Sequence, residues 1–446
     1  MPYQAGRNLP GEHASKLGHL EVLKSPLVQQ IVDNFEQPEA VETSTNIKWE
    51  PFPHLGEPLD LVFAVDGSWQ PVTDERPPHK SIAFIKTALM KVDQIALSRI
   101  DKDEPHPLAL RDLMAEAALY HATAFPLKHV YSKGLSVYDA IRQIIFESLK
   151  DASLNGEVME TFKWLAYEKW SSSPRSSLPP FQCPHSEIDG VAHDATLSFD
   201  AEEGKCATCG KKIFITDMLG FHLEMSENAA SESVATAYMN IHETLLLFTG
   251  VRYFWESSRE TLKRSLFLKD GPLQIRAQYS KLVNPIRNFL LHAYSQGYPI
   301  SIVGQEKTGI FVDHLNLLLG KNVPSNHFFI PDHIYICEQI QSRPSSGAPY
   351  GRDTNYGAKV FIVMNERCRL VLNIPISVRM SEFIYSPDSS KLINLDRILA
   401  TLPGIISSRH ENALIPIEMA NSIASLSTYP SAQVLKLFAE AIIKHK

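Results

Sequence analysis

The feature that most constrains the fold is a set of apolar, β-type segments that come first in the chain and then alternate with helix-type segments. Residues 59–69 (LDLVFAVDGSW) and 81–93 (SIAFIKTALMKVD) have the apolar content of buried strands. Further strands are predicted at 98–101, 265–273, 299–304, 359–364 and 369–376, and helices at 20–34, 107–125, 137–149, 157–169, 233–248, 255–264, 275–296 and from 416 onward. This order favours an α/β fold, with a mixed sheet flanked by helices.

The composition is that of a globular chain. Of the 446 residues, 44% are hydrophobic and 21% are charged, which excludes intrinsic disorder. No apolar run is long enough for a transmembrane helix, and the first residues lack the pattern of a secretory signal. We therefore expect a cytoplasmic protein with no membrane partner. Residues 1–55 are predicted to form an N-terminal helical arm and linker, and residues 56–446 a single domain.

Three of the five cysteines lie in one short region, which is typical of a metal site. Cys206 and Cys209 form a Cys-x-x-Cys pair, whose turn directs both sulfurs toward one tetrahedral Zn²⁺. Cys183 and His185 are the expected partners, with His193 as a substitute for His185. The alternatives are a metal-free loop or a redox pair. Four ligands would make a closed, structural zinc site within an inserted zinc-ribbon-like segment over residues 175–220.

Two apolar strands run into the dipeptide Asp-Gly, at Asp66 and at Asp270. Each dipeptide alone is also typical of a hairpin turn. Two carboxylates at the ends of neighbouring strands, with a Glu from an adjacent helix, would suit one or two Mg²⁺ or Mn²⁺ ions. Such ions activate water and stabilise the leaving oxygen of a phosphodiester. Glu243 and Glu232 are candidates for the helix position, but they lie about three turns apart and cannot share one site.

Four segments appear in an order that resembles the NurA nuclease family: AVDGSW, MNIHETL, FLKDGPL and IVGQEKTGIF. The resemblance covers about residues 55 to 435, and the cysteine segment is similar to the zinc-binding segment of bacterial members. It implies an RNase H-like core and a dimer that degrades DNA with Mn²⁺ or Mg²⁺ beside a HerA-type hexameric ATPase. It also implies that residues 56–446 are a nuclease domain, with Asp66, Glu243 and Asp270 as metal ligands.

The chain departs from the family at its C-terminal end. The family uses a histidine there, whereas this sequence offers Asn421 and Tyr429. Lys307 lies in GQEKTG, which is not a nucleotide-binding P-loop, and is a candidate for a phosphate contact. The setting would be DNA repair or phage defence. The alternatives are a catalytically silent DNA-binding or adaptor subunit, or an enzyme of another RNase H-like lineage.

The formal net charge of −7 excludes a protein with a basic surface throughout. Seven basic residues nevertheless lie between Arg259 and Arg287. A solvated helix face is the ordinary interpretation of such a stretch. Because the stretch flanks Asp270, it is also a candidate for DNA binding. The residues selected for that role are Lys263, Arg264, Lys269 and Arg276.

Overall fold

The computed structural model forms two compact units, Met1–Lys48 and Trp49–Lys446. The structure describes residues 24–34, 47–54, 56–74, 76–93, 118–132, 134–186, 190, 192–318, 324–407, 409–427 and 431–444. The first unit contains the helix α2, Pro26–Asp33, with proline in its first turn. It is shorter than the helix predicted over 20–34, of which residues 20–23 lie outside the described ranges.

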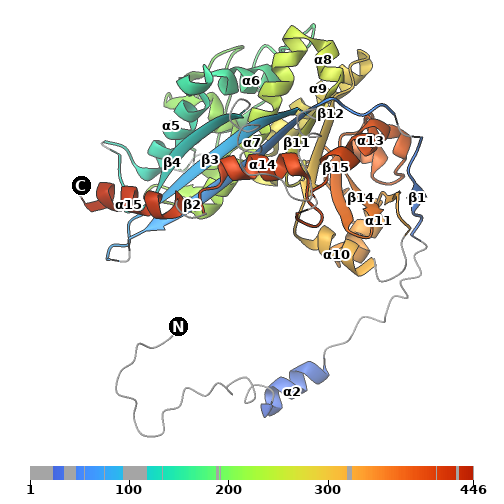
Figure 1. Cartoon of the computed structure of the whole chain (residues 1–446). Coiled ribbons are helices and arrows are strands. Elements are labelled where there is room, and N and C mark those ends of the chain that lie inside the picture. Colours follow the sequence, from blue (N-terminus) through green and yellow to red (C-terminus); the bar gives the residue numbers. More distant parts are fainter. Residues whose placement is uncertain are drawn as a thin grey trace. The chain divides into compact units, whose positions relative to one another are not determined.

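An eleven-stranded mixed sheet forms the centre of the second unit, in the order β1-β13-β14-β15-β12-β11-β2-β3-β4-β10-β9 (Figure 1). The strands are Glu50–Pro51 (β1), Leu61–Thr73 (β2), Ser81–Asp93 (β3), Ala118–Lys128 (β4), Met225–Ser226 (β9), Ala229–Ala230 (β10), Ser265–Asp270 (β11), Ser301–Glu306 (β12), His327–Phe329 (β13), Ala358–Asn365 (β14) and Cys368–Ile374 (β15). β11 is parallel to both β2 and β12, and the other pairs are antiparallel.

Helices cover both faces of this sheet (Figure 1). They are Val137–Leu149 (α5), Glu157–Ala166 (α6), Glu232–Ser257 (α7), Arg259–Lys263 (α8), Val283–Ser295 (α9), Ile310–Leu318 (α10), His333–Tyr335 (α11), Met380–Phe383 (α12), Leu395–Ile405 (α13), Ile415–Ala424 (α14) and Ser431–Lys444 (α15). Short helical turns span Ala152–Leu154, Ile215–Leu219, Phe221–Glu224, Ala277–Leu282, Ile336–Ile340 and Ser389–Lys391. In the described part of the chain, no helix is both long and apolar enough to cross a membrane.

Alternation along β2 explains why the sheet is covered on both faces. Phe63 and Val65 belong to the core under α5, α6, α7 and α9, whereas Val62 and Ala64 belong to the core under α13 and α14. Successive side chains of a strand point to opposite faces, so an uninterrupted apolar run must be buried on both sides. The predicted α/β class with a mixed, helix-flanked sheet is confirmed in these terms.

The strand predicted over 81–93 and the helix predicted over 137–149 have the predicted bounds. The helix predicted over 107–125 is wrong from residue 118 onward, because β4 occupies that position. Its sequence, ALYHATAFPLK, is rich in good helix formers, but pairing with β3 over most of its length overrides this local preference. Residues 107–117, and the strand predicted at 98–101, lie outside the described ranges.

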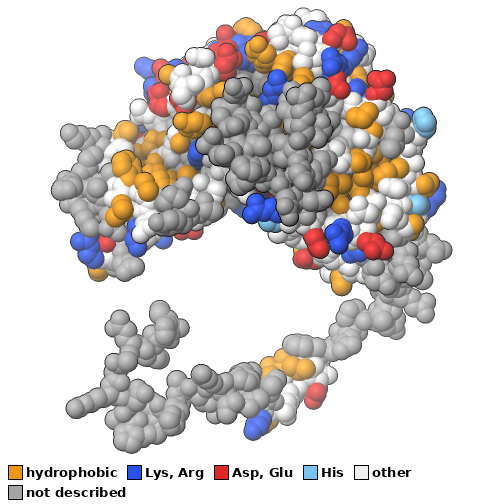
Figure 2. All heavy atoms as spheres, viewed as in Figure 1, with side chains coloured by type: hydrophobic (Ala, Val, Ile, Leu, Met, Phe, Trp, Pro, Cys, Tyr) orange, Lys and Arg blue, Asp and Glu red, His pale blue; other side chains and the backbone are white. Residues whose placement is uncertain are grey.

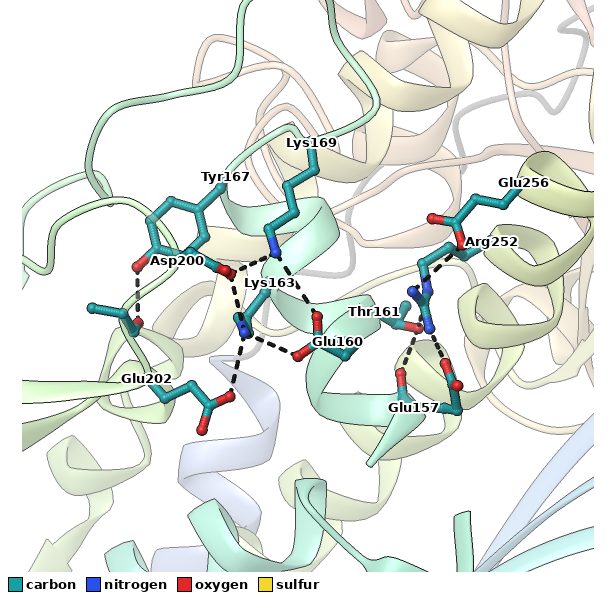
Figure 3. A network of polar contacts seen from close by, with 11 residues as sticks. Glu157, Glu160, Thr161, Lys163, Tyr167, Lys169, Asp200, Glu202, Arg252 and Glu256 are labelled. Carbon is teal, nitrogen blue, oxygen red and sulfur yellow. Dashed lines mark hydrogen bonds and ion pairs between the residues drawn. The ribbon is translucent and has the colours of Figure 1, made fainter. Parts of the chain in front are cut away.

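Two buried cations join the cysteine segment to the helices beside it. Arg142 of α5 donates to both carboxylate oxygens of Asp217, at 2.9 Å each. Lys163 of α6 lies within 3.3 Å of carboxylate oxygens of Glu160, Asp200 and Glu202 (Figure 3). Both cations are less than a tenth exposed. The segment is therefore fixed against the helical layer at both of these points.

Candidate metal centres

The first candidate site lies where β2 and β11 run side by side. The parallel register pairs Val65 with Lys269, which places the next residues, Asp66 and Asp270, level with each other. Strand alternation directs both of these side chains to the face that α14 covers. Two carboxylates from neighbouring strands thus lie beside each other.

Glu243 approaches the same part of β2 from α7, on the opposite face of the sheet. A Cβ atom added to Gly67 would lie 2.5 Å from Glu243 Oε1, so the carboxylate rests against the backbone next to Asp66. Only glycine permits this approach, because any side chain at position 67 would displace either the carboxylate or Met239. The dipeptide Asp66-Gly67 therefore lies inside a strand, where its glycine allows close packing. It does not form the hairpin turn that was the alternative.

Asp66 is a strongly perturbed carboxylate. It is 3% exposed, and its Oδ1 accepts a 2.7 Å hydrogen bond from the Gly67 N–H. Its Oδ2 is buried without a hydrogen-bond partner among the described residues. Burial, and then the charges of Asp270 and Glu243, raise the pKa of Asp66 to about 8. A bound cation would reverse this effect, and carboxylate oxygens are the ligands that hard cations prefer. The oxygens of the three carboxylates do not all lie within 4.8 Å of one another, however, since the cysteine segment holds the only such group among the described residues.

Two lysines neutralise part of the cluster. Lys269 is fully buried, and its Nζ lies 2.7 Å from Glu243 Oε2 and 3.0 Å from the backbone oxygen of Asp270. Burial alone would lower the pKa of Lys269, but the carboxylate of Glu243 outweighs it and the pKa is raised. Lys307, on the loop after β12, lies with its Nζ 3.0 Å from Asp270 Oδ1. Lys269 was predicted to bind DNA, and its complete burial contradicts that role.

Another buried pair lies on β12 and β14. Lys359 Nζ contacts Glu306 Oε1, which also accepts a 2.8 Å hydrogen bond from Asn373 Nδ2. Tyr356, just before β14, places its hydroxyl 3.3 Å from Thr244 Oγ1 on α7. Sequence reasoning missed Glu306 and Lys359 as partners, because they are far apart in the chain and only the sheet brings them together.

The second candidate site is in the cysteine segment. The ligand atoms of Cys183, His193, Cys206 and Cys209 all lie within 4.8 Å of one another. Three thiols and one imidazole suit a tetrahedral Zn²⁺. Burial alone would raise the pKa of Cys206. Hydrogen bonds from the backbone N–H groups of Cys209 and Thr208 outweigh burial, and the pKa is lowered to about 7. Such a shift favours the thiolate form that metals bind.

His193, and not the expected His185, completes this group. Strands β5 (Phe181–Gln182) and β6 (Asp194–Ala195) pair Gln182 with Asp194, so Cys183 lies opposite His193. His185 instead places its Nε2 3.0 Å from the backbone oxygen of Lys212. The Cys-x-x-Cys pair is at the tip of a second hairpin, formed by β7 (Glu203–Lys205) and β8 (Lys212–Phe214). Each hairpin thus supplies two of the four side chains.

Comparison of this chain with known proteins gave matches among solved structures only. No protein-family model matches it, and no curated protein matches it at a significant level. One of the solved structures that align with it is a crystal structure of NurA, with 10% identity and a TM-score of 0.30 over 96% of this chain and 97% of that one. A TM-score this low does not establish a shared fold. The chemistry of the two sites rests on their own residues.

Three further predicted residues lie far from the carboxylate site. Glu232 begins α7, is exposed, and is about 16 Å along the helix from Glu243. Lys263 and Arg264 precede β11, at the end of the strand opposite Asp270 and about 20 Å from it. Arg264 pairs with Asp60, and Lys263 lies over the ring of Tyr298.

Two further predicted residues are exposed. Arg276 follows β11 and is exposed to solvent. Asn421 is also exposed, on α14, a helix that packs against β2. Tyr429 lies outside the described residues. The basic stretch thus does not surround the carboxylates as one surface, and its residues have separate local roles.

Proposed function

We propose that this chain is a metal-dependent DNA nuclease that hydrolyses phosphodiester bonds, with Asp66, Glu243 and Asp270 as ligands of Mn²⁺ or Mg²⁺. Asp66 carries the proposal: its buried Oδ2 has no hydrogen-bond partner among the described residues, and a second carboxylate lies level with it. A buried carboxylate without a counter-charge is costly. Strongly perturbed carboxylates of this kind are candidates for functional sites.

A divalent cation, when bound, supplies a Lewis acid that polarises the phosphate and lowers the pKa of water. The chain positions the reacting groups. Asp66 and Asp270 present oxygens from adjacent strands, and Glu243 is held rigidly by Lys269. The side chain of Lys307 is 31% exposed and can exchange Asp270 for a phosphate oxygen of the substrate.

An RNase H-like core is part of the proposal. The strand order β4-β3-β2-β11-β12 supports it, because three antiparallel strands are followed by two parallel strands, with α7 between β4 and β11. In this arrangement Asp66 is on the central strand and Asp270 on the next one. Residues 56–446 would then be the nuclease domain, with 175–220 as the zinc-binding insertion. A closed Cys₃His site would be structural, because no position is left for substrate.

The biological setting follows from the sequence resemblance alone. We propose that the nuclease acts in the cytoplasm on DNA fed by a HerA-type ATPase, in DNA end processing or defence against phages, and that it works as a homodimer. Exposed apolar side chains on α15, at Val434, Leu437 and Phe438, support an interface with another chain. Figure 2 shows apolar side chains gathered in this part of the surface.

The test is cleavage of single-stranded DNA, double-stranded DNA and RNA in Mn²⁺. Asp66→Asn keeps the shape of the side chain but removes its charge, so DNA cleavage should fall by orders of magnitude. Asp313→Asn, at an exposed position on α10, is the matched control and should cleave like the unaltered chain. Cleavage of RNA alone would assign the site to another RNase H-like lineage. Unchanged cleavage by Asp66→Asn would end the nuclease proposal.

The second candidate function is a catalytically silent DNA-binding or adaptor subunit. The two lysine–carboxylate pairs favour it, because they already neutralise Glu243 and Asp270. In that case no Mn²⁺ binds at Asp66, and DNA binding persists without cleavage. The unpartnered oxygen of Asp66 is the observation that this alternative does not explain.

A further inference from the structure

A cavity of about 320 Å³ lies between α9, the turn at residues 351–354 and the segment that follows β15. Its polar lining consists of Asn284, Arg287, Asn288, Arg352, Asp353 and Arg379. We propose that this cavity binds the terminal phosphate group of a nucleotide, which is a phosphate monoester at the end of a DNA strand or on a free mononucleotide. The inference goes beyond the function proposed above, because binding in this cavity does not require the carboxylate site.

Arg287 contributes a partly buried positive charge to the cavity. Its guanidinium donates to the backbone oxygens of Gly351 at 2.8 Å, Arg352 at 2.6 Å and Asn355 at 2.6 Å. These bonds fix the turn against α9, but neutral carbonyl groups do not cancel the charge. Burial lowers the pKa of Arg287 to about 10, and the charge of Asp353 offsets only part of this effect. An anion in the cavity would supply the missing counter-charge.

Two further arginines have donors to offer to a ligand. Arg379 is exposed, and in the part of the chain that the structure describes its guanidinium has no ion pair or hydrogen bond. Arg352 is paired with Asp353 at 2.9 Å, and both side chains are more than half exposed. Such an exposed pair contributes little free energy and separates readily. Guanidinium groups bind phosphate oxygens in a bidentate manner, so both side chains suit a phosphate group.

The charge of the lining favours a terminal phosphate over an internal one. Three arginines and one aspartate give the lining two net positive charges. These groups are ionised at neutral pH: the pKa of Arg287 stays near 10, and the hydrogen bonds between Arg352 and Asp353 raise the pKa of the arginine and lower that of the aspartate. A phosphate monoester carries about −1.5 to −2 charges at pH 7, whereas a phosphodiester carries one. The monoester is therefore the better match.

The rest of the lining suits the sugar and base of a nucleotide. Apolar side chains come from α9 and from the segment after β15, at Leu290, Leu291, Ile376, Val378 and Met380. Asn284 and Asn288 lie one turn apart on α9, and side-chain amides of this kind pair with the edges of bases. A volume of about 320 Å³ is within the range of small-molecule sites. An inorganic phosphate ion would leave the apolar side chains without a partner.

Tyr356 joins this cavity to the buried face of the sheet that carries Glu243. It lines the cavity, and its hydroxyl lies 3.3 Å from Thr244 Oγ1, in the residue that follows Glu243 on α7. The charges of Lys269 and Glu243 also act on the Tyr356 hydroxyl. A strand end bound in the cavity would therefore lie close to the α7 side of the carboxylate cluster.

The experiment measures the binding of short single-stranded DNA to the full-length, zinc-loaded chain by fluorescence anisotropy, without added Mn²⁺. Three strands of one sequence carry the same internal label and have a 5′-phosphate, a 3′-phosphate or neither. A phosphorylated strand should bind about tenfold more tightly than the strand without a terminal phosphate, since it gains charge-assisted hydrogen bonds. Equal binding of all three strands would overturn the inference.

Competition separates the two sources of the phosphate. If dAMP displaces the phosphorylated strand and deoxyadenosine does not, a free mononucleotide is sufficient as the ligand. If neither displaces it while the preference for the terminal phosphate persists, the ligand is a strand end. Displacement by deoxyadenosine as effective as that by dAMP would contradict the inference, because the phosphate would then contribute nothing.

Charge-matched variants test whether the preference belongs to this cavity. Arg379→Gln removes an exposed guanidinium from the lining and should abolish the preference for the phosphorylated strand. Arg367→Gln removes the same charge from the exposed turn between β14 and β15, at the other end of β15, and should keep the preference. Equal losses in the two variants would overturn the inference.

A change of opposite sign completes the test. Asp353→Asn removes the negative charge of the lining and should tighten binding of the phosphorylated strand, whereas weaker binding would contradict the inference. Asp66→Asn should keep the preference for the terminal phosphate, because the carboxylate site is not involved. A preference that survives in a chain without nuclease activity would thus leave this inference standing, and nuclease activity without a preference would overturn it alone.

Discussion

The carboxylate site and the cysteine site differ in what holds them together without metal. The carboxylate site is built from three elements that are far apart in the sequence: Asp66 on β2, Glu243 on α7 and Asp270 on β11. Two lysines neutralise part of the charge of these carboxylates. Cys183, His193, Cys206 and Cys209 come from two adjacent short hairpins. No lysine or arginine is paired with these four side chains among the described contacts.

The sheet and its helices hold the carboxylate site in place, whereas the cysteine site would stabilise its own segment once it binds a metal ion. The large sheet fixes the carboxylates whether or not an ion is bound, and their lysines limit the repulsion. Hairpins as short as those of the cysteine segment are marginal alone, so a bound metal adds directly to the free energy of folding. We therefore expect changes at the carboxylate site to affect activity, and changes at the cysteine site to affect stability.

The largest effect should come from the helix carboxylate. Glu243→Gln removes a proposed metal ligand and should lower Mn²⁺-dependent cleavage by about 100-fold, since even a supporting partner of a metal site is worth about 10- to 100-fold. Glu232→Gln, on the same helix but exposed, is the control and should cleave normally. Initial rates on labelled DNA measure both. If Glu232→Gln were the more damaging change, the position of the site would be wrong.

The next largest effect should be on stability. Cys206→Ser should remove bound zinc and lower the free energy of unfolding by about 4 kcal/mol or more, as for other structural metal sites. Elemental analysis and urea unfolding measure the two quantities. His193→Ala should lose zinc affinity, whereas His185→Ala should retain it, because His185 contacts the Lys212 backbone instead. Zinc loss in His185→Ala alone would contradict the observed grouping.

A smaller loss of stability should follow when the buried ion pair between the cysteine segment and α5 is removed. Arg142→Met leaves Asp217 buried without its partner and should cost about 3 kcal/mol of unfolding free energy. Lys212→Gln breaks the exposed pair with Glu203 in the same segment and should cost less than about 1 kcal/mol. Similar losses in the two variants would show that the buried pair does not anchor the segment.

The last expected effect is a pH dependence that belongs to the carboxylate site. The pKa of Asp66 is raised from 3.8 to about 8 in the folded chain, so its protonated form favours folding. That contribution is fully present below pH about 4 and is lost as the pH rises through about 8. Without added Mn²⁺, the unaltered chain should therefore lose more stability than Asp66→Asn over this range. Parallel urea-unfolding curves for both chains at every pH would contradict this.

Local patterns were sufficient for several elements and insufficient for others. The strand over 81–93 and the Cys-x-x-Cys turn follow from residues adjacent in the chain. The helix predicted over 107–125 was wrong because β3 offered residues 118–128 a pairing edge that no local pattern reveals. His193 replaced His185 for a similar reason, since strand register and not spacing decides which residue lies opposite Cys183.

By itself, the sequence determined the apolar strands, the helices that flank them, and which residue types could hold metal ions. Those properties depend on periodicity and on chemistry carried by each residue. Only the tertiary structure decided that Lys269 is buried against Glu243 and does not face solvent as part of a basic stretch. The physical reason is that alternation along β11 turns this side chain inward, and the charge of a distant helix residue stabilises it there.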